Sequence, residues 1–309
     1  MTGLVLVVVA VVSWLLPVPA RADPGGLQLV SEQQLNERLL ELTVTTPAIS
    51  DGTSFRVLLP DGYAEHPDER YRVLYLLHGG TSDYTWWTGE GDAQGITAGV
   101  PVIVVMPDGG AGGWYSDWFN FGAGGPPEWE TYHLEQLVPW VDAHFRTDSV
   151  RVIAGLSMGG FGAMSYAARH PGVFVAAASF SGAVDLDSIP ATLTVEASPL
   201  VDLRIPTAVW GLRLLSDARW QAHNPWYLAA NLRGLHLAVY TGNGQPGPLD
   251  GPTLPDPTEY WIHAASLSFH QRLTALGIPH TYEDYGPGTH TAPYWQRDLR
   301  EELPALMTA

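Results

Sequence analysis

Short apolar runs alternate with longer helical stretches along most of this chain, and this alternation restricts the fold more than any other feature. The run Val-Ile-Val-Val-Met at 102–106 is apolar at every position, as in a strand buried on both faces of a parallel sheet. Strands are predicted at 41–45, 55–59, 72–77, 102–106, 150–154, 173–180, 235–240 and 280–285. Helices are predicted at 129–145, 159–170, 260–276 and 294–306. The pattern predicts an α/β fold with a mostly parallel central sheet and helices on both faces.

Domain organisation is expected to be simple. The first two predicted strands are not separated by a helix, so they are expected to form an antiparallel edge. Residues 185–232 interrupt the alternation with Pro-rich and Trp-rich sequence, and we interpret them as a cap-like insertion over a binding site. Because no repeat or linker divides the chain, residues 23–309 are expected to form a single domain.

The first 22 residues have the pattern of an export signal. Residues 4–16 are apolar except for Ser13, and the segment ends in Ala20-Arg21-Ala22. The apolar run is shorter than the roughly 20 residues that span a bilayer, and its small-x-small ending is typical of a signal-peptidase site. We therefore expect residues 1–22 to be a signal peptide and the mature protein to be secreted or to lie in the cell envelope, without a transmembrane segment. The alternative is a buried first strand or helix.

Missing residue types exclude several chemistries. The chain has no cysteine, and all fifteen basic residues are arginine. Disulfides, cysteine nucleophiles, Schiff bases and Walker-A nucleotide binding are therefore excluded. The net charge of -17 argues against nucleic-acid partners and favours neutral or weakly charged ligands.

The strongest chemical motif is Gly155-Leu156-Ser157-Met158-Gly159. This G-x-S-x-G motif stands between a predicted strand and a predicted helix, the context in which a serine is held on a sharp turn at the top of a sheet. A side chain at Gly155 or Gly159 is expected to collide with neighbouring backbone. The backbone N–H of Met158 would then lie at a helix N-terminus, where it can face a developing oxyanion.

A serine nucleophile needs a base, and in this kind of site the partners follow in the order serine, acid, histidine. His290 lies in a loop between the last predicted strand and the last helix, from which it can reach over the sheet. His263 and His270 lie on predicted helix faces, and His236 and His280 lie at strand starts. His290 is therefore the predicted base.

The identity of the acid stays open on pattern alone. Asp250 and Asp256 lie in the loop after the predicted strand at 235–240, and Glu259 opens the next helix. An acidic residue in the first turn of a helix is also common for electrostatic reasons, which gives Glu259 a purely structural alternative.

The second oxyanion donor is predicted in Leu77-His78-Gly79-Gly80-Thr81, which is similar to the His-Gly-Gly motif of esterases and lipases. The amide of Gly80 is the candidate donor, whereas His78 is interpreted as an anchor of the loop. The segment 242–247 matches G-x-G-x-x-G, but a Pro-rich loop follows it, so no dinucleotide site is predicted. No cofactor and no metal site are expected.

From residue 72 to the C-terminus the chain resembles an α/β-hydrolase esterase family. This family includes the mycolyltransferases of mycobacterial cell walls (the antigen 85 complex) and, more distantly, S-formylglutathione hydrolases of the esterase D type. The resemblance rests on an ordered set of matches: Tyr75-Leu76-Leu77-His78-Gly79, Val105-Met106-Pro107, Tyr115-Ser116-Asp117-Trp118, Trp129-Glu130-Thr131, Gly155-Leu156-Ser157-Met158, Val239-Tyr240-Thr241-Gly242-Asn243-Gly244 and Gly288-Thr289-His290. It implies an α/β-hydrolase fold, Ser157 as nucleophile, His290 as base and Glu259 as the best match to the family's acid.

The predicted serine, histidine and acid indicate an enzyme that acts on esters. The main hypothesis is a secreted serine carboxylesterase that forms an acyl-enzyme on Ser157, with a small-molecule or lipid ester as substrate. The alternative is an acyltransferase that moves the acyl chain to a sugar or glycerol-type alcohol, and the second alternative is a non-catalytic cell-surface binding protein on the same fold.

Two positions depart from the mycolyltransferases. Those enzymes carry an aspartate where His78 stands and an arginine where Thr81 stands, and both residues help to hold trehalose. A trehalose site is therefore in doubt here. Six tryptophans are candidates for the mouth of the site, although at least half of them are expected to serve ordinary packing: Trp86, Trp87, Trp114, Trp118, Trp210 and Trp226.

Overall fold

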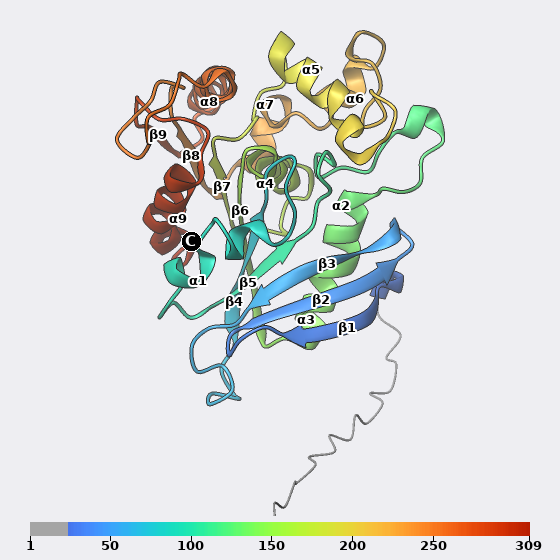
Figure 1. Ribbon diagram of the computed structural model, residues 1–309, viewed down its shortest axis with the longest axis vertical. Coiled ribbons are helices and arrows are strands. Elements are labelled where there is room, and N and C mark those ends of the chain that lie inside the picture. The colour runs from blue at the N-terminus through green and yellow to red at the C-terminus, as the bar shows by residue number, and fades with distance from the viewer. Residues whose placement is uncertain (1–23) are drawn as a thin grey trace, which may run out of the picture.

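The computed structural model describes residues 24–309, which are built around one nine-stranded sheet (Figure 1). The predicted signal peptide at 1–22 lies outside the described residues. Along the sheet the strand order is β1-β2-β3-β5-β4-β6-β7-β8-β9. The strands are β1 (Gln28–Gln34), β2 (Leu39–Thr46), β3 (Ile49–Leu58), β4 (Tyr71–Leu77), β5 (Val102–Pro107), β6 (Thr147–Leu156), β7 (Ala176–Phe180), β8 (His236–Thr241) and β9 (Thr281–Asp284).

The predicted division into an antiparallel edge and a parallel centre is confirmed. β1, β2 and β3 pair antiparallel, β3 joins β5 antiparallel, and the pairs from β5 to β9 are parallel. The edge strand β1 was not predicted. Its sequence, Gln-Leu-Val-Ser-Glu-Gln-Gln, has no two-residue alternation, and all seven residues are exposed. No apolar face therefore marks it as a strand.

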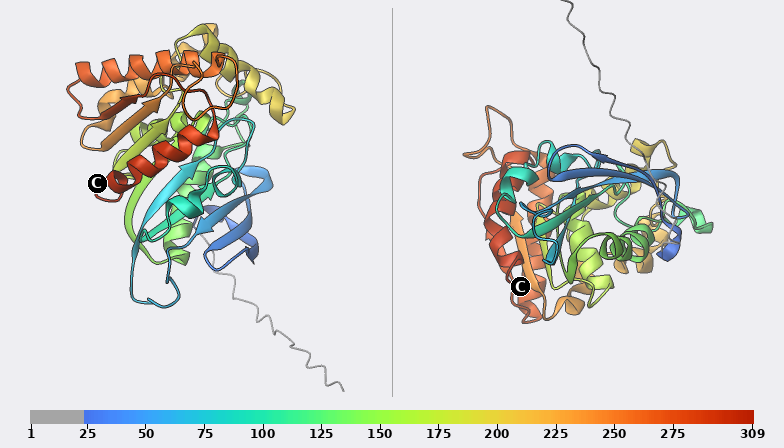
Figure 2. Two further views of the ribbon diagram at one scale, coloured as in Figure 1. Left: turned by 60° about the vertical axis from the view of Figure 1, so that its left-hand side comes forward. Right: turned by 90° about the horizontal axis from the view of Figure 1, so that it is seen from below.

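Helices cover both faces of the sheet, as Figure 2 shows. In β4, Val73, Tyr75 and Leu77 point to the core beneath α3, α4 and α8, whereas Leu74 and Leu76 point to the core beneath α1 and α9. The central strands are therefore buried on both faces, which explains their continuous apolar runs. The helices are α1 (Ala93–Ile96), α2 (Trp129–Thr131), α3 (Val138–His144), α4 (Met158–Arg169), α5 (Ile189–Ala197), α6 (Asp217–Gln221), α7 (Pro225–Leu228), α8 (Pro257–Ala275) and α9 (Ala292–Leu306).

One predicted helix is not continuous. Residues 129–144 form α2, a π-helical turn at Tyr132–Leu137 (η4) and then α3. Short 3-10 turns complete the secondary structure: η1 (Pro24–Gly26), η2 (Trp86–Thr88), η3 (Asn120–Gly122), η5 (Ser198–Asp202), η6 (Arg213–Leu215) and η7 (Ala229–Leu232).

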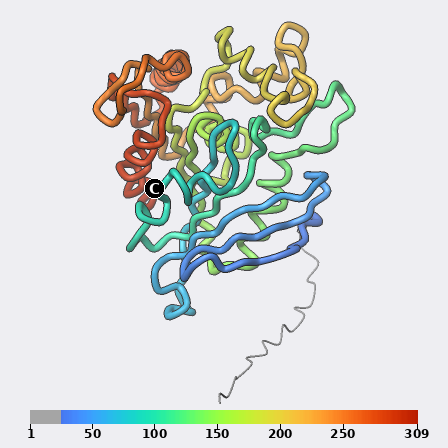
Figure 3. Tube along the Cα trace, in the orientation of Figure 1, coloured from blue at the N-terminus to red at the C-terminus, as the bar shows by residue number. Residues whose placement is uncertain are grey.

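Residues 185–232 leave the sheet after β7 and return to it at β8, forming short helical pieces from α5 to η7. The chain trace in Figure 3 shows this segment, in yellow, as a separate group of turns above α4. It therefore lies on the side of the molecule where the loop between β6 and α4 begins.

The strand order places a natural crevice in the sheet. The chain runs from β4 outward to β5 in one direction and then returns to β6 on the other side of β4. The loops at the carboxyl ends of β4 and β6 consequently run in opposite directions and leave a crevice between them. In open α/β sheets ligands bind in such a crevice, at the point where the strand order reverses. The loops that follow these two strands contain Gly80 and Ser157.

Candidate active site

Ser157 occupies the turn between β6 and α4 with a positive φ of 53° and ψ of -120°. This backbone conformation is strained for a residue with a side chain, and such strain is concentrated at functional sites. The neighbouring glycines make the turn sterically feasible. A Cβ on Gly155 would lie 2.3 Å from the carbonyl oxygen of Gly159, and a Cβ on Gly159 would lie 2.4 Å from the carbonyl oxygen of Leu77. Both predicted collisions with backbone are confirmed.

His290 and Glu259 are joined by a short hydrogen bond. The distance between His290 Nδ1 and Glu259 Oε2 is 2.7 Å, and the Glu259 side chain has no exposed surface. His290 follows β9 and Glu259 lies in the first turn of α8, after the neighbouring strand β8. The imidazole also packs edge-on against Trp295, with ring centroids 4.8 Å apart. Because a carboxylate only accepts hydrogen bonds, the Nδ1 atom carries the proton and Nε2 is left as the basic nitrogen.

The second oxygen of Glu259, Oε1, accepts hydrogen bonds from three further donors, one of which is Thr241 Oγ1 at 3.2 Å. Ser181 Oγ and the backbone N–H of Gly242 each donate to Oε1 at 2.8 Å. Ser181 is fully buried directly after β7, and it has a positive φ of 46°. Ser181 is not predicted as a site residue from the sequence. Its position after a strand that neighbours β8 was the available signal, because the carboxyl ends of parallel strands meet at one edge of a sheet.

The other two candidate acids stabilise loops. Asp256 caps α8, because its Oδ1 accepts from the N–H of Thr258 at 2.8 Å and its Oδ2 accepts from the N–H of His290 at 3.1 Å. Asp250 accepts hydrogen bonds from the side chains of Thr289 and Tyr294. Partial burial alone would raise the pKa of Asp250, but these hydrogen bonds hold the pKa below its usual value. Of the three acids, Glu259 is the one whose side chain contacts the His290 ring.

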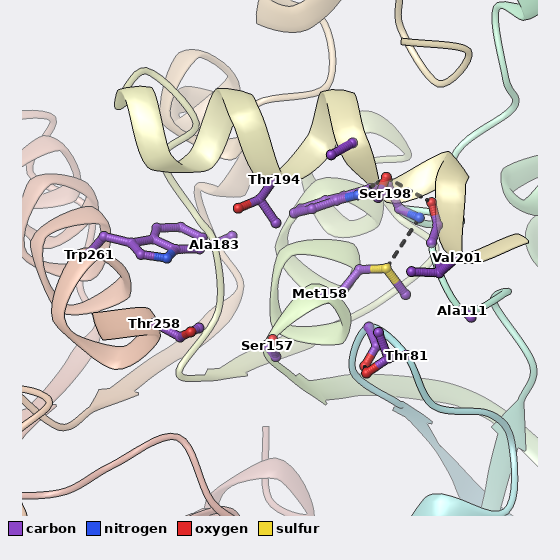
Figure 4. Close-up of a pocket in the computed structure, with 14 residues that line it drawn as sticks. Thr81, Ala111, Ser157, Met158, Ala183, Thr194, Ser198, Val201, Thr258 and Trp261 are labelled. Atoms are coloured by element: carbon purple, nitrogen blue, oxygen red, sulfur yellow. Dashed lines mark hydrogen bonds between the residues drawn. The ribbon is translucent and has the colours of Figure 1, made fainter. Parts of the chain in front are cut away.

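A cavity of about 310 Å³ lies beside Ser157 (Figure 4). Its lining is mostly apolar and comes from the loop after β4, the loop after β5, the start of α4, the insertion and α8. The lining residues are Gly80, Thr81, Ala111, Gly112, Trp114, Ser157, Met158, Ala183, Thr194, Ala197, Ser198, Val201, Thr258 and Trp261. The volume is at the lower end of the range for small-molecule pockets.

The two predicted oxyanion donors, Gly80 and Met158, both line this cavity with Ser157. Within residues 24–309 neither amide N–H has a hydrogen-bond acceptor. Met158 is the first residue of α4, where backbone N–H groups have no partner within the helix. An anion formed beside Ser157 would therefore meet donors that no protein group already uses.

The insertion forms one side of the cavity through Thr194, Ala197, Ser198 and Val201, as Figure 4 shows. The expectation that at least half of the six candidate tryptophans serve ordinary packing is confirmed. Of the six candidates only Trp114 lines this cavity, and its indole Nε1 donates to Ser198 Oγ at 2.9 Å. Trp87, Trp118 and Trp210 are buried in the cores, whereas Trp261 of α8 lines the cavity and was not predicted. Because Trp261 stands inside a helical pattern, nothing in the sequence separates it from packing residues.

His78 is an anchor of its loop, as predicted. Its Nδ1 donates to the carbonyl of Gly79 at 2.7 Å, and its Nε2 accepts from the N–H of Gly109 at 2.9 Å. The side chain is buried, and both ring nitrogens are occupied by backbone groups. His78 therefore connects the loops that follow β4 and β5.

In the described part of the chain no three His, Cys, Asp or Glu side chains gather into a group that could hold a metal ion. The same part contains no helix that is both long and apolar enough to cross a membrane. After the G-x-G-x-x-G segment the chain continues as a loop to Asp256, so no helix N-terminus follows the motif directly.

The sheet order, the strained serine between β6 and α4, and the cavity at the carboxyl ends of the strands define an α/β-hydrolase fold. Residues 46–306 match the family model described as "Putative esterase", and the chain belongs to this esterase family.

Two of the relatives that the chain resembles are mycobacterial proteins. Esterase Rv1288 of Mycobacterium tuberculosis is 37% identical over 284 residues, which cover 87% of this chain and 59% of that protein. The chain thus spans less than two thirds of the length of that relative. The diacylglycerol acyltransferase/mycolyltransferase Ag85B of Mycobacterium leprae is 30% identical over 278 residues, covering 84% of this chain and 81% of the relative.

Solved structures share the fold at low sequence identity. Mycobacterium tuberculosis MPT51 aligns with a TM-score of 0.69 and 24% identity, covering 87% of this chain and 97% of the other. An S-formylglutathione hydrolase from Agrobacterium tumefaciens aligns with a TM-score of 0.69 and 18% identity, covering 91% and 98% of the two chains. The expected resemblance to both groups is confirmed at the level of the fold and the family.

Proposed function

We propose that this protein is an exported serine carboxylesterase that uses Ser157, His290 and Glu259 as a catalytic triad. The observation that carries the proposal is the 2.7 Å contact of His290 Nδ1 with the fully buried Glu259. The strained turn after β6 separately places Ser157 at an apolar cavity. A buried carboxylate that holds one histidine tautomer is the arrangement that activates a serine hydroxyl.

In the proposed reaction Ser157 Oγ attacks the carbonyl carbon of an ester while His290 Nε2 takes the hydroxyl proton. The amides of Met158 and Gly80 stabilise the negative charge on the carbonyl oxygen, and Glu259 stabilises the imidazolium. Collapse of the tetrahedral intermediate breaks the ester bond, and His290 returns the proton to the leaving alcohol. Water, deprotonated by His290, then attacks the acyl-enzyme and releases the carboxylic acid and the free serine.

The apolar cavity favours an ester with a compact apolar acyl group. A cavity of about 310 Å³ accepts a short chain or a single ring, and a longer chain would have to extend out of the mouth. The net charge of -17 favours a neutral substrate over an anionic one.

Acyl transfer is the second candidate, supported by the relatives named diacylglycerol acyltransferase/mycolyltransferase. The same acyl-enzyme would then be attacked by a sugar or glycerol-type alcohol instead of water. Against trehalose as acceptor stands the replacement of the aspartate and arginine of the mycolyltransferases by His78 and Thr81. A product assay decides: the protein is incubated with p-nitrophenyl esters of increasing chain length, with and without trehalose or glycerol, and free acid is compared with acylated acceptor. Acylated acceptor in excess of free acid would refute hydrolysis as the main reaction.

A fluorophosphonate probe tests the triad itself and separates both enzymes from the third candidate, a non-catalytic binding protein. We expect the wild-type protein to be labelled and Ser157→Ala not to be labelled. A folded wild-type protein that stays unlabelled would contradict the proposed triad.

Export and domain organisation complete the proposal. Residues 1–22 have the composition of a signal peptide, and residues 23–309 are proposed to form one α/β-hydrolase domain with a cap-like insertion at 185–232. N-terminal sequencing of the protein recovered from culture medium or cell envelope should begin at Asp23. Recovery of the chain from the cytoplasm with residues 1–22 attached would contradict export.

A further inference from the structure

The insertion between β7 and β8 exposes an unusual number of aliphatic side chains. Of the eighteen large hydrophobic residues that are exposed within residues 24–309, nine lie between positions 189 and 215. Leu203, Leu214 and Leu215 are 96%, 86% and 81% exposed. Exposed apolar residues that gather in one place, instead of being scattered singly, mark an interaction site. The nine residues, called here the aliphatic surface, are Ile189, Leu193, Leu200, Val201, Leu203, Ile205, Leu212, Leu214 and Leu215.

Helix geometry and one hydrogen bond bring parts of the aliphatic surface together. Ile189 and Leu193 are one helical turn apart on the exposed side of α5, whose opposite side buries Ala191 and Val195. The η6 turn is joined to α5, because the N–H of Arg213 donates to the Glu196 carboxylate at 2.7 Å. Leu212, Leu214 and Leu215 therefore lie beside α5.

The aliphatic surface is continuous with the cavity beside Ser157. Val201 is 47% exposed and also lines the cavity, and the neighbouring Ala197 is likewise exposed and part of the lining. In Figure 4 the helical segment that carries Thr194, Ser198 and Val201 lies directly over the cavity. The acyl chain of a ligand bound at this surface could therefore extend into the cavity while it stays in contact with apolar side chains.

The charges of this segment fit a lipid surface that contains phosphate groups. Residues 189–215 contain two acidic and two basic side chains, so their net charge is zero in a chain with a net charge of -17. The two carboxylates accept hydrogen bonds from backbone N–H groups, Glu196 from Arg213 and Asp202 from Gly112. Arg204 is exposed between Leu203 and Ile205; Asp202 interacts with it electrostatically, but the two side chains do not form a direct ion pair. A guanidinium flanked by exposed aliphatic residues can bind a headgroup phosphate while its neighbours enter the acyl region.

We propose that the aliphatic surface docks this protein onto zwitterionic phospholipid surfaces, with Leu203, Leu214 and Leu215 as its main apolar contacts and Arg204 on the phosphates. The substrate would then be a lipid ester in that surface, and this part of the inference rests on the proposed esterase function. The part of the acyl chain next to the carbonyl would enter the cavity while the rest stays in the lipid. The strongly acidic remainder of the molecule would be repelled by an anionic membrane, which favours zwitterionic lipid.

Flotation with phosphatidylcholine vesicles tests the docking without any need for catalysis. The wild-type chain should float with the vesicles, and the variant Leu203→Ser/Leu214→Ser/Leu215→Ser should bind at least about tenfold more weakly. Each of these side chains is more than four-fifths exposed, so the variant should keep the wild-type Tm. A matched control, Leu29→Ser/Val30→Ser/Leu35→Ser, removes three exposed apolar side chains at the distant end of the sheet and should float like the wild type.

Equal flotation of the two triple variants, or no flotation of the wild type, would overturn the docking proposal. A wild-type dimer in sedimentation that the insertion variant converts to monomer, without vesicle binding, would overturn it in favour of a second copy as the occupant. Hydrolysis of a water-soluble p-nitrophenyl ester by the wild type is measured in parallel. Vesicle binding without this hydrolysis refutes the esterase function and leaves the docking intact, whereas hydrolysis without vesicle binding refutes only the docking.

Discussion

His290 Nδ1 lies 2.7 Å from a carboxylate oxygen of Glu259, which has no contact with solvent. The two residues come from neighbouring strand ends and are 31 positions apart in the chain. Because Ser181, Thr241 and Gly242 also donate to Glu259, its carboxylate cannot rotate away without losing three further hydrogen bonds. The geometry fixes both the orientation and the tautomer of the imidazole.

Replacement of Glu259 by glutamine should lower kcat by roughly 10³- to 10⁴-fold, since an amide at this position no longer stabilises the imidazolium. The measurement is steady-state hydrolysis of p-nitrophenyl butyrate. Asp256→Asn is the comparison variant: asparagine can keep the cap on α8, but its NH2 group cannot accept from the N–H of His290, so we expect a loss far smaller than that of Glu259→Gln. Comparable losses in both variants would show that Glu259 has no special role.

Ala197→Phe should change the preference for acyl chain length. Ala197 lies at the exposed rim of the cavity, so a larger side chain there narrows the cavity without disturbing a core. We expect kcat/KM for p-nitrophenyl octanoate to fall at least about tenfold more than kcat/KM for the acetate ester. A proportionate loss for both esters would mean that the acyl group binds elsewhere.

Gly159→Ala should prevent stable folding, because the new Cβ would lie 2.4 Å from the carbonyl oxygen of Leu77 and 2.6 Å from that of His78. Both obstacles are backbone atoms, and relieving them would push α4 away from the sheet at a cost of about 3 kcal/mol or more. Gly251→Ala is the control, since no atom lies within 4 Å of its Cβ position. Thermal unfolding should show a large drop in Tm or insoluble protein for the first variant and little change for the second.

Acid should destabilise the fold through His133. This side chain is fully satisfied as the neutral imidazole, with Nε2 donating to the carbonyl of Asp108 and Nδ1 accepting from Tyr166 Oη, each at 2.8 Å. Burial lowers the pKa of His133 from 6.5 to about 4. Between these values the unfolded chain binds a proton that the folded protein excludes, so stability falls as the pH decreases through this window, by up to about 3 kcal/mol.

The variant His133→Gln isolates this contribution. Its unfolding free energy, measured in urea from pH 7 to pH 4, should decrease less steeply than that of the wild type. Parallel curves for the two proteins would show that His133 does not couple protonation to folding. His223, whose pKa burial also lowers to about 4, should account for part of the remaining slope.

The sequence was sufficient for the parts of the molecule that depend on local patterns. Buried strands show as apolar runs, and the glycines around Ser157 mark a turn that other residues cannot form. The edge strand β1 was not predicted, because a strand that is exposed on both faces shows no alternation of apolar and polar residues. Ser181 and Trp261 were not predicted for a different reason. The contact of Ser181 with Glu259 and the position of Trp261 at the cavity depend on which strands and helices become neighbours, and the sheet order determines that. The choice among Asp250, Asp256 and Glu259 likewise needed the loop conformation, which places two of them on backbone N–H groups and loop hydroxyls.

The sheet order also has a consequence for how the proposed catalytic residues come together. Gly80, Ser157, Glu259 and His290 follow four different strands that are distributed over more than two hundred positions of the chain. No two of these four residues follow the same strand. The proposed site can therefore form only after β4, β6, β8 and β9 have joined one sheet. Fluorophosphonate reactivity regained after dilution from denaturant would therefore report completion of long-range strand pairing, later than the return of helical circular dichroism.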